Sequence, residues 1–183
     1  VFGPGLTRTS LSATNSTGLA TGAYTGETEV KEGVLEVASG TIREDADVTI
    51  DANAVLDLGG DPTNRVTIAA VSGDGRVVNG FLAGGMKVGI VSEATTGNAC
   101  LQLGAGLKVK DGFNVTFEAD ENVTLKKGLR FAIAERADGT AVFDCTSWRA
   151  RGLPFKLSAE FTEEGGVVYA KLTGAKGLVI KLQ

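Results

Sequence analysis

The sequence predicts an all-β protein built as a parallel β-helix (a β-solenoid) with a C-terminal β cap. Apolar residues alternate over short runs, which is the pattern of strands rather than helices. Glycine is abundant, with 26 residues in a chain of 183, roughly twice average usage. Strand-like sequences also recur every 20 residues or so, which is typical of one solenoid coil.

The chain divides into three expected regions. Residues 1–23 are rich in Thr, Ser, Gly and Ala, which indicates an extended arm, a peripheral strand or a disordered lead-in. Residues 24–128 are expected to form the coils, from short strands separated by the turn residues Gly, Asn, Asp and Ser. The expected strands are 27–31, 33–37, 47–50, 54–58, 65–69, 75–78, 86–91, 99–103, 107–109, 114–118 and 122–125.

An approximate internal repeat supports the coils. Val34-Leu-Glu-Val37 recurs as Val55-Leu-Asp-Leu58 after 21 residues, and Val48-Thr-Ile50 recurs as Val66-Thr-Ile68 after 18. Strands this short cannot bury an apolar face alone. They need an equivalent strand on either side, stacked about 4.8 Å away.

Residues 129–183 differ in character and are expected to form the cap. Apolar residues alternate over 129–134, 168–172 and 178–182, which predicts longer, half-buried strands. The large aromatic side chains are also concentrated here, at Phe143, Trp148, Phe155 and Phe161. Such a region would cover the open end of the solenoid, whose last coil otherwise exposes unpaired backbone groups.

Composition excludes several classes of function. The net charge is −4 and no long block of one sign is present, which argues against a nucleic-acid partner. No apolar run approaches the roughly 20 residues of a membrane span. The chain has no histidine, so a Ser-His-Asp or Cys-His catalytic site cannot form. We therefore expect a protein without enzyme activity or cofactor.

Cys100 and Cys145 form an even pair without metal-type spacing. In a secreted protein they are expected to form a disulfide, which would contribute about 4 kcal/mol in the chain-entropy model. Two buried free thiols are the alternative.

The densest acidic group is Asp45, Asp47, Asp51 and Asp57. Two of these carboxylates facing one groove at about 5–10 Å could act on a glycoside. Asp and Asn oxygens also suit calcium, although the glycine–aspartate repeat of calcium-binding solenoids is missing. We favour the simpler interpretation of solvated turn carboxylates beside Arg43, and predict neither a catalytic nor a metal site.

Trp148 is the one tryptophan, and Arg149 follows it. An exposed indole could stack on a sugar ring or hold Arg149 by a cation–π contact, which makes the pair a candidate ligand contact. A tryptophan in a cap more often belongs to the core.

One stretch resembles a known family. Tyr24-Thr-Gly-Glu-Thr-Glu-Val-Lys-Glu-Gly-Val-Leu-Glu-Val37 is similar to the autotransporter-associated β-strand repeat, whose pattern is roughly Tyr-Thr-Gly-Gly-Thr-x-Val-x-x-Gly-x-Leu-x-Val. Glu27 departs from it, because the family has a second glycine there. The stretch from Asp47 to Gly80 resembles the coils that follow this repeat, and the tail resembles the end of large secreted bacterial proteins. The resemblance implies an extracellular, right-handed parallel β-helix without enzyme activity.

The expected function is therefore that of a non-enzymatic structural protein, secreted or on the cell surface, that presents a surface or self-assembles. The chain begins at Val1 without a leader, which indicates a processed form or an excised fragment. Filaments formed by strand addition are one form of assembly, with the arm at 1–23 as the added strand. The alternatives are an adhesin or carbohydrate-binding module with surface glycans as partners, and a polysaccharide-acting β-helix enzyme. For the fold, the alternative is a β-sandwich.

Overall fold

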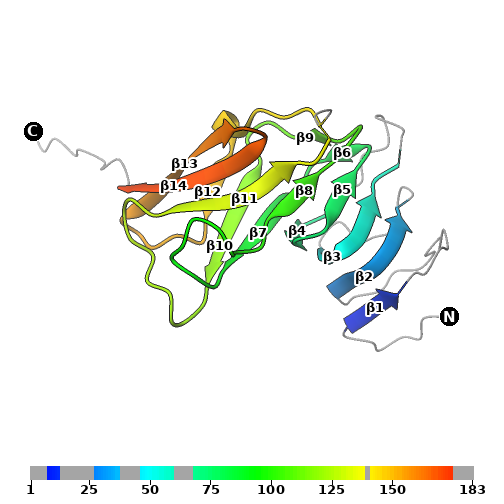
Figure 1. The fold of residues 1–183 in the computed structure, drawn as a ribbon, viewed down its shortest axis with the longest axis horizontal. Coiled ribbons are helices and arrows are strands. Elements are labelled where there is room, and N and C mark those ends of the chain that lie inside the picture. The colour runs from blue at the N-terminus through cyan, green and yellow to red at the C-terminus, as the bar shows by residue number, and fades with distance from the viewer. Residues whose placement is uncertain (1–7, 13–26, 38–45, 60–67, 139–140, 175–183) are drawn as a thin grey trace, which may run out of the picture.

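The computed structural model describes residues 8–12, 27–37, 46–59, 68–138 and 141–174. In this part of the chain the regular structure is a 12-stranded sheet, a two-stranded sheet and one turn of 3-10 helix (Figure 1). The prediction of an all-β protein is thus confirmed. The strands are β1 (Arg8–Ser12), β2 (Glu27–Glu36), β3 (Asp47–Asp57), β4 (Ala70–Gly73), β5 (Arg76–Val78), β6 (Phe81–Leu82), β7 (Gly85–Ile90), β8 (Leu101–Leu103), β9 (Lys108–Val109), β10 (Asn114–Ala119), β11 (Arg130–Arg136), β12 (Arg149–Arg151), β13 (Leu157–Glu164) and β14 (Val167–Gly174).

Parallel pairing dominates the large sheet. A first ladder runs β1–β2–β3–β4–β7–β10–β12, and a second runs β2–β3–β5–β8–β11. A third, shorter ladder joins β6 to β9 and continues through a bridge from Lys108 to Val142. The antiparallel pairs are β11–β14 and β13–β14, so the described residues lack the facing antiparallel sheets of the alternative β-sandwich.

Strands β2 and β3 each belong to two ladders because each is bent. The pairing register between them shifts after Val30, and Gly33 lies just beyond the shift with a φ of 80°. A bulge of this kind bends a strand while its flanking hydrogen bonds are kept. The strands expected at 27–31 and 33–37 are therefore the two halves of β2, and those expected at 47–50 and 54–58 are the halves of β3.

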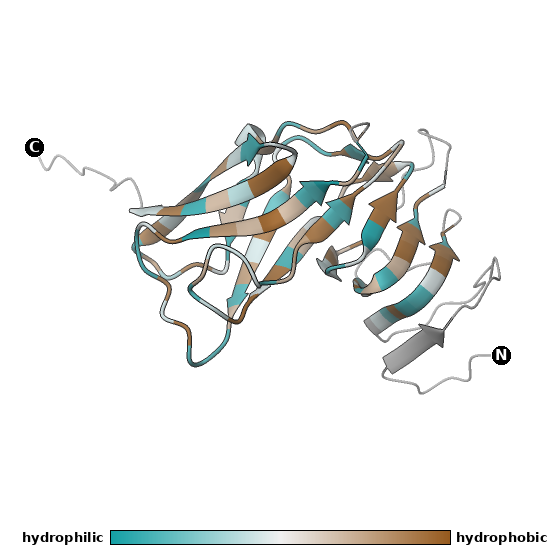
Figure 2. Cartoon of the chain, in the orientation of Figure 1, coloured by the Kyte–Doolittle hydropathy of each residue, from teal (hydrophilic) through white to brown (hydrophobic). Residues whose placement is uncertain are grey.

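Buried side chains stack from strand to strand along each ladder. In the second ladder Leu35 pairs with Leu56, Leu56 with Val77, and Val77 with Leu103, and all four are buried. In Figure 2 this appears as apolar bands that alternate with polar ones along the arrows. Burying one such side chain stabilises a protein by about 1.5–3 kcal/mol, so this stacking is the main source of stability.

The internal repeat is confirmed at one place. Val34 pairs with Val55 and Leu35 with Leu56, as the Val-Leu-Glu-Val repeat predicts. Val48 pairs with Val71 of β4, and Val66 of the second repeat lies outside the described residues. Strand β4 has the sequence Ala-Val-Ser-Gly, which lacks the expected motif but still places Val71 at a buried position.

The region expected to be the cap, 129–183, begins with a strand of the parallel sheet. Strand β11 falls in the region expected to be cap, yet it pairs in parallel with β8, and the hairpin β13–β14 then adds to β11. Residues 122–125 form no strand, although one was expected there. Strands β4, β6, β12 and β13 were not expected. The strand predicted at 178–182 and positions 65–67 of the strand predicted at 65–69 lie outside the described residues.

A pair of glycine substitutions tests how closely the backbone just before β7 approaches the backbone just before β4. A Cβ atom at Gly84 would lie 1.7 Å from the carbonyl oxygen of Ile68, whereas a Cβ atom at Gly89 meets nothing within 4 Å. We expect Gly84→Ala to lower the free energy of unfolding by about 2 kcal/mol or more, in the range of other overpacking substitutions. Gly89→Ala, the matched control, should leave it unchanged or raise it slightly. Equal urea midpoints for the two variants would contradict this close approach.

Candidate functional site

The predicted ligand contact at Trp148 is corrected by the structure, because the side chain is only 6% exposed. Its ring lies 5.5 Å from that of Phe113, 5.5 Å from that of Phe143 and 6.0 Å from that of Phe161, measured between centroids. Phe161 belongs to β13, so the hairpin closes over the end of the core through these rings. Trp148 is therefore a core residue of the cap, and its indole face is not available for a sugar.

Arg149 points the other way and is exposed on β12. It pairs with Asn114 of β10, and Arg151 pairs with Thr116. No strand of the described residues pairs with the other edge of β12. A three-residue edge strand that carries two arginines resists edge-to-edge association, so this end of the first ladder is protected.

An ion pair that the sequence did not indicate links the hairpin β13–β14 to β11 of the second ladder. Arg136 of β11 and Glu163 of β13 form two hydrogen bonds of 2.8 Å. The guanidinium also donates to the carbonyl oxygen of Ala141 and lies 4.1 Å from the ring centroid of Phe143. The hydrogen bonds from Arg136 hold the pKa of Glu163 below its usual value. No local motif marks this pair, since the two residues lie 27 positions apart.

This pair gives a pH-dependent prediction. Because the pKa of Glu163 is lower in the folded state, its contribution is present above the unfolded value of about 4.3 and is lost as the pH falls through the folded value. We expect Glu163→Gln to cost about 1 kcal/mol near neutral pH, as for partly exposed ion pairs, and nothing in strong acid.

The measurement is urea denaturation across the acid range, with Glu160→Gln on the same strand as control. Glu160 is exposed and has no ion pair in the described part of the chain. A difference between wild type and Glu163→Gln that persists below the folded pKa would contradict this role.

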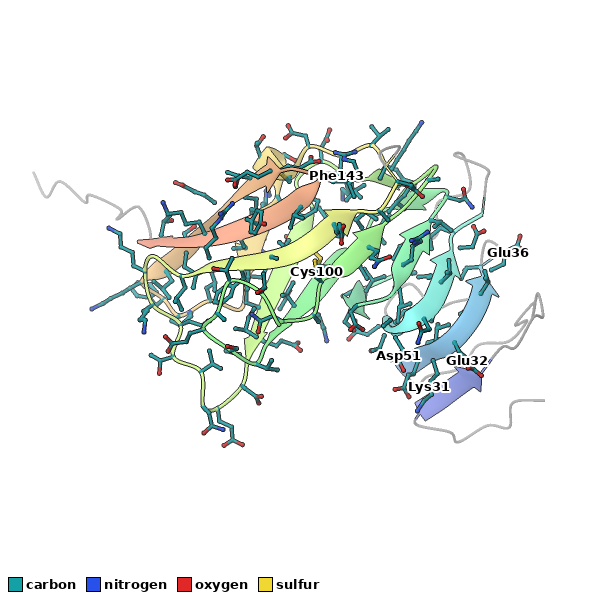
Figure 3. All side chains as sticks on the ribbon, viewed as in Figure 1. Lys31, Glu32, Glu36, Asp51, Cys100 and Phe143 are labelled. Atoms are coloured by element: carbon teal, nitrogen blue, oxygen red, sulfur yellow. The ribbon has the colours of Figure 1, made fainter. Side chains whose placement is uncertain are left out.

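Cys100 and Cys145 are free thiols in the structure, which is the alternative to the predicted disulfide. Cys100, labelled in Figure 3, precedes β8 and is half-buried, whereas Cys145 is buried in the 3-10 helix Cys145–Ser147. Burial raises the pKa of the Cys100 thiol to about 11 and also raises that of Cys145. Because the thiolate is the reactive form, both cysteines are poor nucleophiles near neutral pH.

The state of the thiols can be measured directly. In denaturant without reductant, a thiol-reactive dye should detect both cysteines, and the intact mass should match the reduced chain. In the native protein at about pH 8, labelling should be much slower than for a free cysteine, whose pKa is about 8.5. A mass lower by two hydrogens, with no reactive thiol after unfolding, would instead establish the disulfide.

The acidic group of the sequence is separated by the fold. Asp47 forms an ion pair of 2.6 Å with Lys87, which also approaches Glu118 at 3.6 Å. The hydrogen bond that Lys87 donates to Asp47 raises the pKa of Lys87. Asp57, at the other end of β3, accepts hydrogen bonds from the side chain of Asn79 and the backbone of Gly59. Asp45 lies outside the described residues.

These carboxylates therefore act in structure. Asp47 links β3 to β7, and Asp57 holds the turn at Asn79, whose φ of 56° is unusual for a residue other than glycine. Among the described residues no group of three or more His, Cys, Asp or Glu side chains could hold a metal ion. The same residues contain no helix long and apolar enough to cross a membrane.

The N-terminal end of the first ladder is the remaining candidate site. Residues 8–12, inside the predicted arm, form β1, which pairs in parallel with β2. Figure 3 shows Lys31, Glu32, Glu36 and Asp51 on β2 and β3 at this end, away from Phe143. The rest of the arm, 1–7 and 13–23, lies outside the described residues. Part of the arm therefore occupies the sheet edge to which an added strand was expected to bind.

The comparisons identify no relative: no protein-family model matches this chain, and neither a curated protein nor a solved structure matches it. The resemblance to the autotransporter-associated repeat stays a prediction.

Proposed function

We propose that this chain is a non-enzymatic scaffold: a short, right-handed β-solenoid of an extracellular or cell-surface protein that associates with further copies of itself. The three parallel ladders support the solenoid, because β4, β5 and β6 are followed in the same order by β7, β8 and β9. The resemblance at 24–37 supports the handedness and the location.

The single observation that carries the assembly is the pairing of β1 with β2. Strand β1 has one partner strand in the sheet and is separated from it in sequence by 13–26, the stretch between Ser12 and Glu27. A chain of that length, at about 3.3 Å or more per residue, can reach a neighbouring molecule. The same backbone hydrogen bonds then form between copies, which is a strand exchange of low energetic cost.

The two ends of the first ladder differ, so strand exchange is favoured at one end only. The C-terminal end of the first ladder is the short, arginine-bearing β12, and the edge strand β13 carries Glu160, Glu163 and Glu164; such charged edges disfavour strand addition. At the N-terminal end the five-residue β1 is the outermost strand. Self-association therefore uses the N-terminal edge, with β1 of one copy on β2 of the next.

Removal of the arm tests the proposal. We expect the full chain to form oligomers whose mass rises with concentration, and a variant beginning at Ala23 to remain monomeric. Leu11→Pro should act like the truncation while keeping the length, because proline has no N–H to donate to the ladder, in which position 11 pairs with Val30. Thr14→Pro, beyond the last residue of β1 in the sequence, is the matched control. Size-exclusion chromatography with light scattering reads the masses.

Two results would contradict the proposal. One is a full-length chain that stays monomeric at every concentration. The other is an armless variant that assembles as well as the full chain. Circular dichroism of each variant separates loss of assembly from loss of folding.

A further inference from the structure

An open groove lies over the third ladder. Its lining residues come from β6, β9, the residues just after them and the segment 142–144 that precedes the 3-10 helix, and its volume is about 620 Å³. In this ladder Leu82 and Val109 are buried, so the residues next to them along each strand face outward. Phe81 pairs with Lys108, and Lys108 with Val142, which places three outward side chains in one row.

The outward row is unusual because apolar and cationic groups alternate across it. Val142 is 61% exposed and Phe81 is half-buried, with Lys108 between them. Lys110 lies two residues beyond Lys108, on the same side of the chain and about 7 Å further along. A single exposed valine is ordinary, but here it lies within a groove that also contains charged groups.

The lysines of the groove form no ion pair with any residue that the structure describes. Lys108 and Lys110 are exposed, and neither has an ion pair within the described part of the chain. Lys87, which is half-buried on the first ladder, has two carboxylate partners. The groove therefore offers two cations to a ligand, although the chain as a whole has a net charge of −4.

Two carboxylates, Asp111 and Asp144, also line the groove. Asp144 is held in place because it accepts hydrogen bonds from the backbone and hydroxyl of Thr146, at 3.0 and 2.6 Å. These bonds keep its pKa below the usual value, so it stays an anion and an acceptor. The groove therefore combines acceptors for hydroxyl groups with cations for acidic groups and an apolar surface.

We propose that this groove binds a linear acidic oligosaccharide, of the class whose sugars carry carboxylates. The carboxylates pair with Lys108 and Lys110, the hydroxyl groups donate to Asp111 and Asp144, and the C–H faces of the rings lie on Val142 and Phe81. A nucleic acid fits less well, because its backbone offers fewer hydroxyl groups than a sugar chain to donate to Asp111 and Asp144. The groove is independent of β1, so the proposal holds whether or not copies assemble.

Isothermal titration with a galacturonic acid hexamer tests the proposal on the full chain. We expect saturable binding that weakens with salt, and no binding of a neutral maltohexaose. Replacing both lysines, Lys108→Gln with Lys110→Gln, should weaken binding at least about tenfold, since two charge-assisted hydrogen bonds are lost. Val142→Asp should weaken it as well, by charge and by loss of the apolar surface.

The matched control replaces two lysines outside the groove, Lys156→Gln with Lys171→Gln. Both are exposed, and neither has an ion pair in the described ranges, so binding should not change. All substituted side chains are exposed, and unchanged thermal unfolding would show that each variant folds. The proposal is overturned by absent binding of the acidic hexamer, by equal binding of the neutral one, or by equal losses in both lysine pairs. A hexaglutamate peptide that binds as tightly would overturn it in favour of a peptide site.

Discussion

The fold depends on the lateral stacking of apolar side chains between neighbouring parallel strands. Strands β5 and β8 are three residues long. The middle residue of β5 and the two outer residues of β8 are buried, and each strand needs the strands beside it to cover them. Leu56 is covered by Leu35 on one side and Val77 on the other, so neither neighbour can be removed without exposing it. Stability is therefore shared along the ladder rather than held by any one strand.

This constraint makes the two ends of the ladder different from its middle. The last strands have a neighbour on one side only, and their exposed apolar groups need another cover. At the C-terminal end the cover is the hairpin, with Phe161 against Phe117 and Trp148 at centroid distances of 6.5 and 6.0 Å. At the N-terminal end the cover is β1, a strand from a segment of low apolar content. The weaker cover is where we place exchange between copies.

The same constraint decides where ligand chemistry can lie. Inward positions are occupied by the stacked core, so polar groups are confined to outward positions and to turns. On the first ladder these charges pair with each other, as Asp47 and Lys87 do, and they stabilise the sheet. On the third ladder Lys108 and Lys110 have no such partners in the described part of the chain, and an apolar residue lies beside them. A surface of this kind can bind a ligand without disturbing the ladder below it.

Much of the architecture follows from local sequence. The alternation in Val34-Leu-Glu-Val37 and its repeat at 55–58 predicts both the strands and their pairing, because the two motifs present the same residues to the same face. Local sequence did not indicate that Val48 pairs with Val71, because the segment around Val71 lacks the motif. It also left both alternatives open for Trp148 and for the two cysteines.

What the amino-acid sequence determined by itself was the class of structure, an all-β fold of short strands and glycine turns. The tertiary structure alone decided which strands are neighbours, that Trp148 is buried, that Arg136 meets Glu163, and that Phe81, Lys108 and Val142 share one row. The physical reason is that alternation depends on adjacent residues, which a sequence displays directly. Register depends on how long each connection is and on which distant side chains it brings together.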